Sequence, residues 1–108
     1  MNRRPSTDGL EALLAGHIGR DRGVTAATIA ARLGCTDRTV RELVTELRFA
    51  GRGICGRPET GYFIAATAEE LEETCGFLRE RALHSLKLES QMRHVPLPDL
   101  LGQLRLKT

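Results

Sequence analysis

Three cysteines and three histidines could in principle do chemistry in this chain. Cys35, Cys55 and Cys75 are odd in number, lie 20 residues apart and include no Cys-x-x-Cys pair, which argues against a disulfide framework and a structural zinc site. His84 and His94 stand on polar segments, and no nucleophile with its base, no paired carboxylates and no metal-ligand cluster occurs at workable spacing. We expect reduced cysteines, no metal, no cofactor and no catalysis, with cysteine oxidation as the alternative role.

Arginine and threonine side chains form the other group with recognisable chemistry. An apolar stripe with helical spacing is made by Val40, Leu43, Val44 and Leu47. On or near the opposite, solvated side of that helix stand Arg38, Arg41, Glu42, Thr45 and Arg48. Guanidinium groups bind phosphate oxygens and guanine edges, so this side could read DNA.

The charge is distributed unevenly along the chain. Residues 1–66 hold 10 arginines and 7 carboxylates, for a net charge of +3, whereas residues 67–108 hold 6 basic and 7 acidic residues, for a net charge of −1. A basic surplus favours a polyanionic partner such as nucleic acid, although a few surplus charges are also common on proteins that never contact DNA. The surplus therefore lies with the arginine-bearing helix.

Three helices are predicted before residue 51. The first runs from about Ser6 to Arg20, with a cap at Ser6, Thr7 or Asp8 and with Glu11 placed to reach back to a free amide. Its apolar face combines Leu10, Leu13, Leu14 and Ile18.

The second and third helices are separated by a sharp turn. Thr25 is a plausible cap for the second, Gly34 can stop it in the left-handed conformation, and Thr36 can cap the third. After glycines at 51, 53 and 56, the segment ICGRPETGYFIA predicts two short strands around a turn that contains Pro58 and closes at Gly61.

Ala30, Gly34 and Val40 stand where a helix-turn-helix requires a small residue, a turn glycine and an apolar anchor. With ATIAARLGCTDRTVRELVTELRFAG, then GI and TGYFIA, residues 10–66 resemble the winged helix-turn-helix family of the biotin repressor's amino-terminal domain and of deoxyribose-operon-type repressors. The resemblance implies a mainly α, α+β fold of three helices and a two-stranded wing, and binding to double-stranded DNA. The sequence departs from the family at Cys35, which replaces the usual valine or isoleucine, and in its short wing.

By this resemblance the recognition helix runs from Asp37 to about Ala50. The residues it implies for DNA contact are Thr36, Arg38, Thr39, Arg41, Glu42, Thr45, Arg52 and Arg57. Arg38 and Arg41 suit guanine or phosphate, the threonines suit phosphate oxygens, and Arg57 at the wing tip suits the minor groove or backbone. Glu42 could accept from cytosine or merely pair with Arg38, and for each residue a plain solvated surface role stays open.

A long helix is predicted from Ala68 to about Arg93, opened by a capping box of Thr67 and Glu70. Its apolar residues fall into two stripes, which favours pairing with a second copy in a homodimer. The residues assigned to that contact are Leu71, Phe77, Leu78, Leu86, Leu88 and Met92. A helix kinked near Gly76 that folds back is the alternative.

Three regions are thus expected: a DNA-binding domain at 1–66, a dimerisation helix at 67–94 and a tail at 95–108 that is a possible protein-binding segment. The leading hypothesis is a small dimeric transcriptional repressor or regulator of bacterial or phage origin. The alternatives are a protein-interaction module and a phage replication or recombination accessory factor. No secretion signal or membrane-spanning run is expected, so we predict a cytoplasmic, nucleoid-associated protein with no membrane partner.

Overall fold

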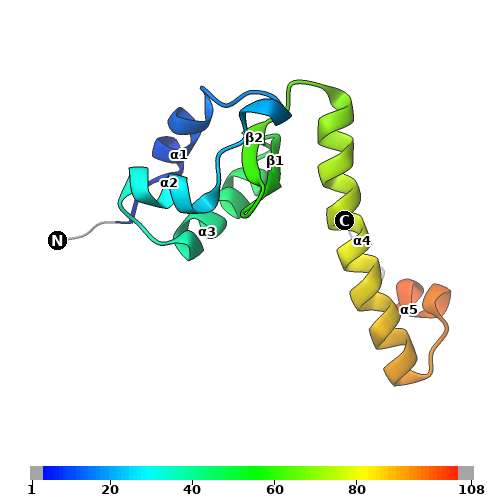
Figure 1. Cartoon of the computed structure of the whole chain (residues 1–108). Helices are drawn as coiled ribbons and strands as arrows, with labels where there is room; N and C mark the ends of the chain where they lie inside the picture. The colour runs from blue at the N-terminus through cyan, green and yellow to red at the C-terminus, as the bar shows by residue number, and fades with distance from the viewer. Residues whose placement is uncertain (1–3, 105–108) are drawn as a thin grey trace. The chain divides into compact units, whose positions relative to one another are not determined.

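The computed structural model describes residues 4–104 of the chain, which divides into two compact units, residues 1–74 and 75–108. Helices α1, α2 and α3 gather beside the two-stranded sheet in the first unit (Figure 1). In chain order the elements are α1 (Thr7–Leu14), the 3-10 turn η1 (Arg20–Arg22), α2 (Ala26–Leu33), α3 (Asp37–Phe49), β1 (Ile54–Arg57), β2 (Gly61–Ile64), α4 (Ala68–Arg93) and α5 (Leu97–Gln103).

The turn between α2 and α3 forms as its residues predict. The Thr25 hydroxyl caps α2 by accepting from the Thr28 amide, and Gly34 ends that helix with φ 68°, a left-handed conformation that a side chain would strain. Two residues later the Thr36 hydroxyl accepts from the Thr39 amide and starts α3. Local capping therefore sets the sharp turn that places α3.

Helix α1 is shorter than its apolar spacing predicts. Ser6 is the cap, but the helix ends at Leu14 instead of Arg20, so placing Ile18 on the helix face was wrong. The backbone there pairs with β2: the Gly19 amide donates to the Ile64 carbonyl at 2.8 Å, and the Ile64 amide donates to the His17 carbonyl at 2.8 Å. These bonds replace helical ones after Gly16 and leave Ile18 bridged to Ile64 and half exposed.

The core of the first unit is built from all three helices and the sheet. Its fully buried side chains include leucines, isoleucines and valines, each of which contributes about 1.5–3 kcal/mol by leaving water. The core cluster consists of Leu10, Leu14, Val24, Ala26, Ile29, Ala30, Val40, Leu43, Val44, Leu47, Ile54 and Tyr62. The buried stripe predicted for α3 is confirmed, and it fixes which side of α3 faces solvent.

Strands β1 and β2 form an antiparallel wing, with Ile54 opposite Ile64 and Gly56 opposite Tyr62. Gly56 has φ 91°, and a Cβ there would overlap the Gly61 carbonyl, so the tight pairing requires glycine. A further antiparallel bridge joins Val24 to Tyr62 and ties the wing to the segment before α2.

Helix α4 begins with the predicted capping box. The Thr67 hydroxyl accepts from the Glu70 amide at 3.1 Å, and one Glu70 carboxylate oxygen accepts from the Ala66 amide at 2.8 Å. The other Glu70 oxygen accepts from the Arg20 amide at 3.0 Å. These amide bonds lower the pKa of Glu70, with the Arg20 amide contributing most.

The second unit holds the rest of α4 and α5. Helix α4 runs for 26 residues without interruption at Gly76 and ends at Arg93, beyond which His94 has φ 56°. The tail does not continue the helix through Pro96, as predicted, but it forms the short helix α5, and Leu100 is buried. Residues 105–108 of the tail and 1–3 of the expected first domain lie outside the described residues.

The observed order of three helices, a two-stranded wing and a long C-terminal helix confirms the predicted winged helix-turn-helix fold. Among the helices of residues 4–104, none has the length and apolar character required to cross a membrane. The division of roles among residues 1–66, 67–94 and 95–108 stays a prediction.

Candidate nucleic-acid interface

Helix α3 presents one row of side chains directly away from the core. Arg38, Glu42, Thr45 and Phe49 follow one another at steps of four, three and four residues, opposite the buried stripe. The Arg38 side chain is 83% exposed and donates from Nε to Glu42 Oε1 at 3.2 Å. Thr45 donates its hydroxyl to the Arg41 carbonyl at 3.0 Å. If α3 entered a groove of nucleic acid with its solvated side, the side chains of this row would be the first to contact it.

The N-terminus of α3 carries the two threonines predicted to contact phosphate. Thr36 is exposed, and its hydroxyl is engaged both with the Thr39 amide and with the Thr39 hydroxyl at 3.1 Å. Thr39 is half-buried. The amides of the first helical turn carry partial positive charge that favours an anion, whereas Asp37 in the same turn opposes one.

Arg48 braces the wing. The sequence places this residue on or near the solvated side of α3, and in the structure its side chain is half-buried. Its guanidinium donates from Nε to the Ile54 carbonyl at 2.9 Å and from Nη2 to the Gly56 carbonyl at 3.2 Å, and it lies over the Tyr62 ring at 5.9 Å. These contacts fix the wing to the end of α3.

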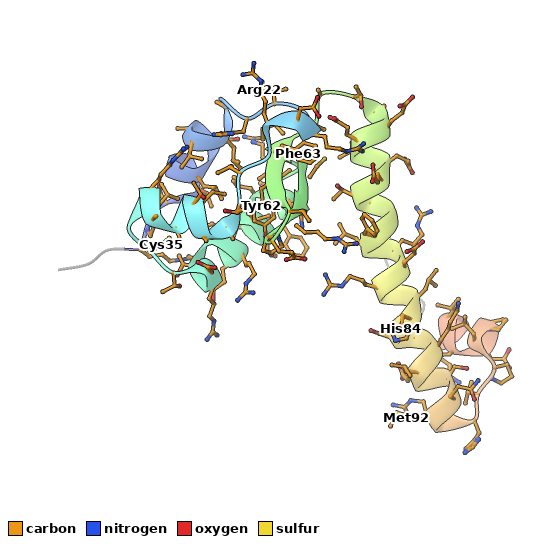
Figure 2. All side chains as sticks on the ribbon, in the orientation of Figure 1. Arg22, Cys35, Tyr62, Phe63, His84 and Met92 are labelled. Carbon is orange, nitrogen blue, oxygen red and sulfur yellow. The ribbon has the colours of Figure 1, made fainter. Side chains whose placement is uncertain are left out.

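Arg41 lies on the wing side of α3. Burial raises the pKa of the Tyr62 hydroxyl, and the positive charges of Arg48 and Arg41 act in the opposite direction. Arg41 itself is exposed, seven residues and two helical turns before Arg48 on the same side. The cationic side of α3 thus borders the wing, to which Tyr62 belongs (Figure 2).

Residues 18–63 match the family model described as HTH domain. No curated protein and no solved structure shows a significant match to the chain. Together with α1 and the last residue of β2, residues 18–63 make up the winged helix-turn-helix fold. The match supports a DNA-binding regulatory domain, and its range takes in α2, the turn, α3 and most of the wing.

The two other arginines predicted to contact DNA lie outside α3. Arg57 is exposed at the end of β1, beside a wing turn whose Pro58 carbonyl accepts from the Ala26 amide at 3.0 Å. Arg52 donates from Nε to Glu11 Oε2 at 2.5 Å, so Glu11 binds this arginine and not the amide that the sequence suggested. Arg52 follows the C-terminal end of α3, whereas Thr36 and Arg38 lie at the other end of that helix.

Sequence reasoning missed two residues of this surface. Phe49 is 89% exposed at the end of the outward row, and its spacing from Arg38 and Thr45 was a usable signal. Arg4 contacts the carboxylates of Glu42 and Glu46, at 3.7 Å and 2.6 Å. Because Arg4 is 42 residues from Glu46 in the chain, no local pattern could have revealed this contact.

The cysteines form no pair among the described residues. Cys35 is half-buried in the turn of the helix-turn-helix domain, Cys55 is buried, Cys75 is exposed, and none of the three forms a disulfide within residues 4–104. Within residues 4–104, no group of three or more His, Cys, Asp or Glu side chains is placed to hold a metal ion.

The residues predicted for dimerisation fall into different environments. Phe77, Leu78, Leu88 and Met92 are exposed on α4, with Met92 at 81%. Leu86 is half-buried within the second unit. Leu71 belongs to the first unit and its side chain lies against Gly53.

Proposed function

We propose that the protein is a sequence-specific double-stranded DNA-binding protein that acts as a dimeric transcriptional regulator or repressor. The DNA-binding part rests on the outward row of α3, which lies within residues that match an HTH domain model. Thr36 caps the N-terminus of this helix, and Arg48 connects its other end to the wing. In such domains the N-terminal part of the second helix reads base edges in the major groove.

The proposed contacts divide by chemistry. Arg38 and Arg41 pair with guanine or clamp phosphates, since both guanidinium groups are exposed. The Thr36 and Thr39 hydroxyls and the Thr45 hydroxyl serve phosphate oxygens, and Glu42 accepts from cytosine or pairs with Arg38. At the wing, Arg57 is assigned to the backbone or minor groove, and Arg52 is a weaker phosphate contact.

The test is binding to duplex DNA over a salt series, comparing the wild type with Arg38→Ala/Arg41→Ala. We expect wild-type affinity to fall steeply with salt and the variant to bind more weakly. Its salt slope should be lower by about one for each of the two arginines that contacts a phosphate. The matched control is Arg79→Ala/Arg81→Ala, which removes two exposed arginines of α4 and the same charge. No wild-type binding at low salt, or equal losses in both variants, would contradict the assignment.

The dimer is proposed from the second unit. Below about 40 residues a segment rarely sustains a core of its own, and residues 75–108 leave large apolar side chains of α4 and α5 exposed. A second copy that covers Phe77, Leu78, Leu88 and Met92 is the simplest partner for such a helix. Two reading helices would then meet half-sites about one helical turn, roughly 10 base pairs, apart.

Sedimentation of the full chain tests the dimer. We expect a mass of two chains for the wild type and of one chain for Leu88→Asp/Met92→Asp, because a buried unpaired carboxylate opposes association. Gln91→Asp, at an exposed polar position of the same helix, is the control that adds charge without removing apolar surface. A wild type that sediments as one chain at micromolar concentration would contradict the proposal.

A protein-interaction module is the second candidate function. It is favoured by the exposed Leu101 of α5 and the exposed Leu104 that follows this helix, which a plain DNA-binding dimer does not require. The DNA titration separates the two candidates, because a module of this kind has no use for the arginines of α3.

A further inference from the structure

The recognition helix α3 carries no surplus of positive charge. Its three arginines, Arg38, Arg41 and Arg48, are balanced by Asp37, Glu42 and Glu46. Arg48 is also committed to the carbonyls of the wing. With Arg48 engaged, α3 has two arginines left to approach phosphates but carries three carboxylates. This excess of negative charge opposes binding to a polyanion.

The carboxylates concerned lie together on one flank. Glu42 and Glu46 are four residues apart, so their side chains are neighbours on the helix surface and repel each other. Arg4 Nη2 lies 2.6 Å from Glu46 Oε2 and 3.7 Å from Glu42 Oε2, and all three side chains are about half exposed. One guanidinium from the start of the chain thus joins both carboxylates.

The two oxygens of Glu42 have different partners. Oε1 accepts from Arg38, and Oε2 faces Arg4. When Arg38 turns from Glu42 toward a base or phosphate, Glu42 loses one cation but keeps the other. Arg4 is therefore placed to neutralise Glu42 in the state where Arg38 is used for binding.

We propose that Arg4 is a positioning residue of the DNA interface: it neutralises the Glu42 and Glu46 flank of α3 and thereby makes Arg38 available to DNA. The proposal rests on the DNA-binding function proposed above and adds to it a residue from the N-terminal segment. Arg4 acts through the two carboxylates and makes no base contact in this assignment. Loss of Arg4 leaves two uncompensated negative charges beside the phosphates.

A double-mutant cycle on the full-length protein tests this role. Binding to a labelled random-sequence duplex is measured at low salt for the wild type, Arg4→Ala, Glu42→Gln/Glu46→Gln and the triple variant. We expect Arg4→Ala to weaken binding about three- to fivefold, the size typical of an exposed charge pair, and to change it less than about twofold when both carboxylates are already amides. On this random-sequence duplex, where no cytosine contact of Glu42 is selected, the Glu42→Gln/Glu46→Gln variant should bind more tightly than the wild type, because it removes two negative charges beside the phosphates.

The control is Arg22→Ala, which removes the same charge from η1, on the far side of the first unit from α3 (Figure 2). Thermal melting of every variant separates loss of folding from loss of binding. Equal weakening by Arg4→Ala in both backgrounds would overturn the proposal in favour of a direct phosphate contact, and no weakening in either would remove Arg4 from the interface. Absence of wild-type binding at low salt would instead reject DNA binding as the function.

Discussion

The two units of the chain differ in how many of their large apolar side chains they bury. Among the described residues, the first unit exposes Ile18, Phe49 and Leu71 as its large apolar side chains and buries a core drawn from three helices and the sheet. The second unit buries Leu100 and exposes more than it buries. Its exposed large apolar residues are Phe77, Leu78, Leu88, Met92, Leu101 and Leu104. The first unit is stabilised by its own core, whereas the second leaves most of its large apolar side chains exposed.

The comparison is tested most strongly by removing the same atoms from each unit. Leu43→Ala in the core should lower the free energy of unfolding by about 2–5 kcal/mol, because it leaves a cavity among packed side chains. Leu88→Ala on α4 should change it by less than about 0.5 kcal/mol in dilute protein, since that side chain is half exposed. Urea unfolding at two protein concentrations measures both effects.

The concentration series supplies the control. A loss in Leu88→Ala that grows with protein concentration would locate the leucine in a dimer contact, because association stabilises by mass action. Equal losses for Leu43→Ala and Leu88→Ala at low concentration would mean that the second unit has a packed core, and the contrast between the units would fail.

Within the first unit, substitution of Arg48 should lower stability, whereas substitution of Arg38 should lower DNA binding. Arg48→Ala should lower the free energy of unfolding by about 1–2 kcal/mol, because it leaves the Ile54 and Gly56 carbonyls without their charged donor. Arg38→Ala should leave stability within about 0.5 kcal/mol, since its side chain is 83% exposed, and should weaken DNA binding. Thermal melting and duplex titration of the two variants give the comparison.

Arg38→Ala is here the matched control for loss of an arginine from α3. The assignment of roles would be contradicted if Arg38→Ala lowered the melting temperature as much as Arg48→Ala did.

The smallest expected effect concerns Glu70 at the start of α4. The amides of Arg20 and Ala66 favour its charged form, so its pKa in the folded state lies below the ordinary 4.5. A depressed pKa contributes stability that is present above that ordinary value and is lost as pH falls through the folded pKa. The stability difference between wild type and Glu70→Gln should therefore shrink as the pH is lowered below 4.5.

Acid titration of the melting temperature measures this difference. Glu72→Gln, an exposed carboxylate of the same helix, controls for the change in net charge. A difference between wild type and Glu70→Gln that stayed constant with pH would contradict the assigned cause.

Short-range signals predicted much of the fold and part of the site. Thr25, Gly34 and Thr36 each act on a backbone group within five residues, so their residue types are sufficient to predict the helix-turn-helix. Thr67 and Glu70 likewise predicted the start of α4. The apolar period of α3 predicted its buried face and therefore the side on which Arg38, Glu42 and Thr45 are exposed.

The contacts between distant segments were not predictable in the same way. Ile18 has the correct spacing for α1, yet pairing with Ile64 takes its backbone out of the helix. Arg48 lies near the solvated side by period alone, yet the wing carbonyls half-bury it.

The sequence by itself determined α2, α3 and α4, their caps and the left-handed turn at Gly34, because each depends on interactions within a few residues. Only the tertiary structure decided that Arg48 braces the wing, that Arg52 binds Glu11 and that Arg4 joins Glu42 and Glu46. An arginine side chain reaches any carboxylate or carbonyl that folding brings near it, and its partner is therefore set by the positions of segments tens of residues away.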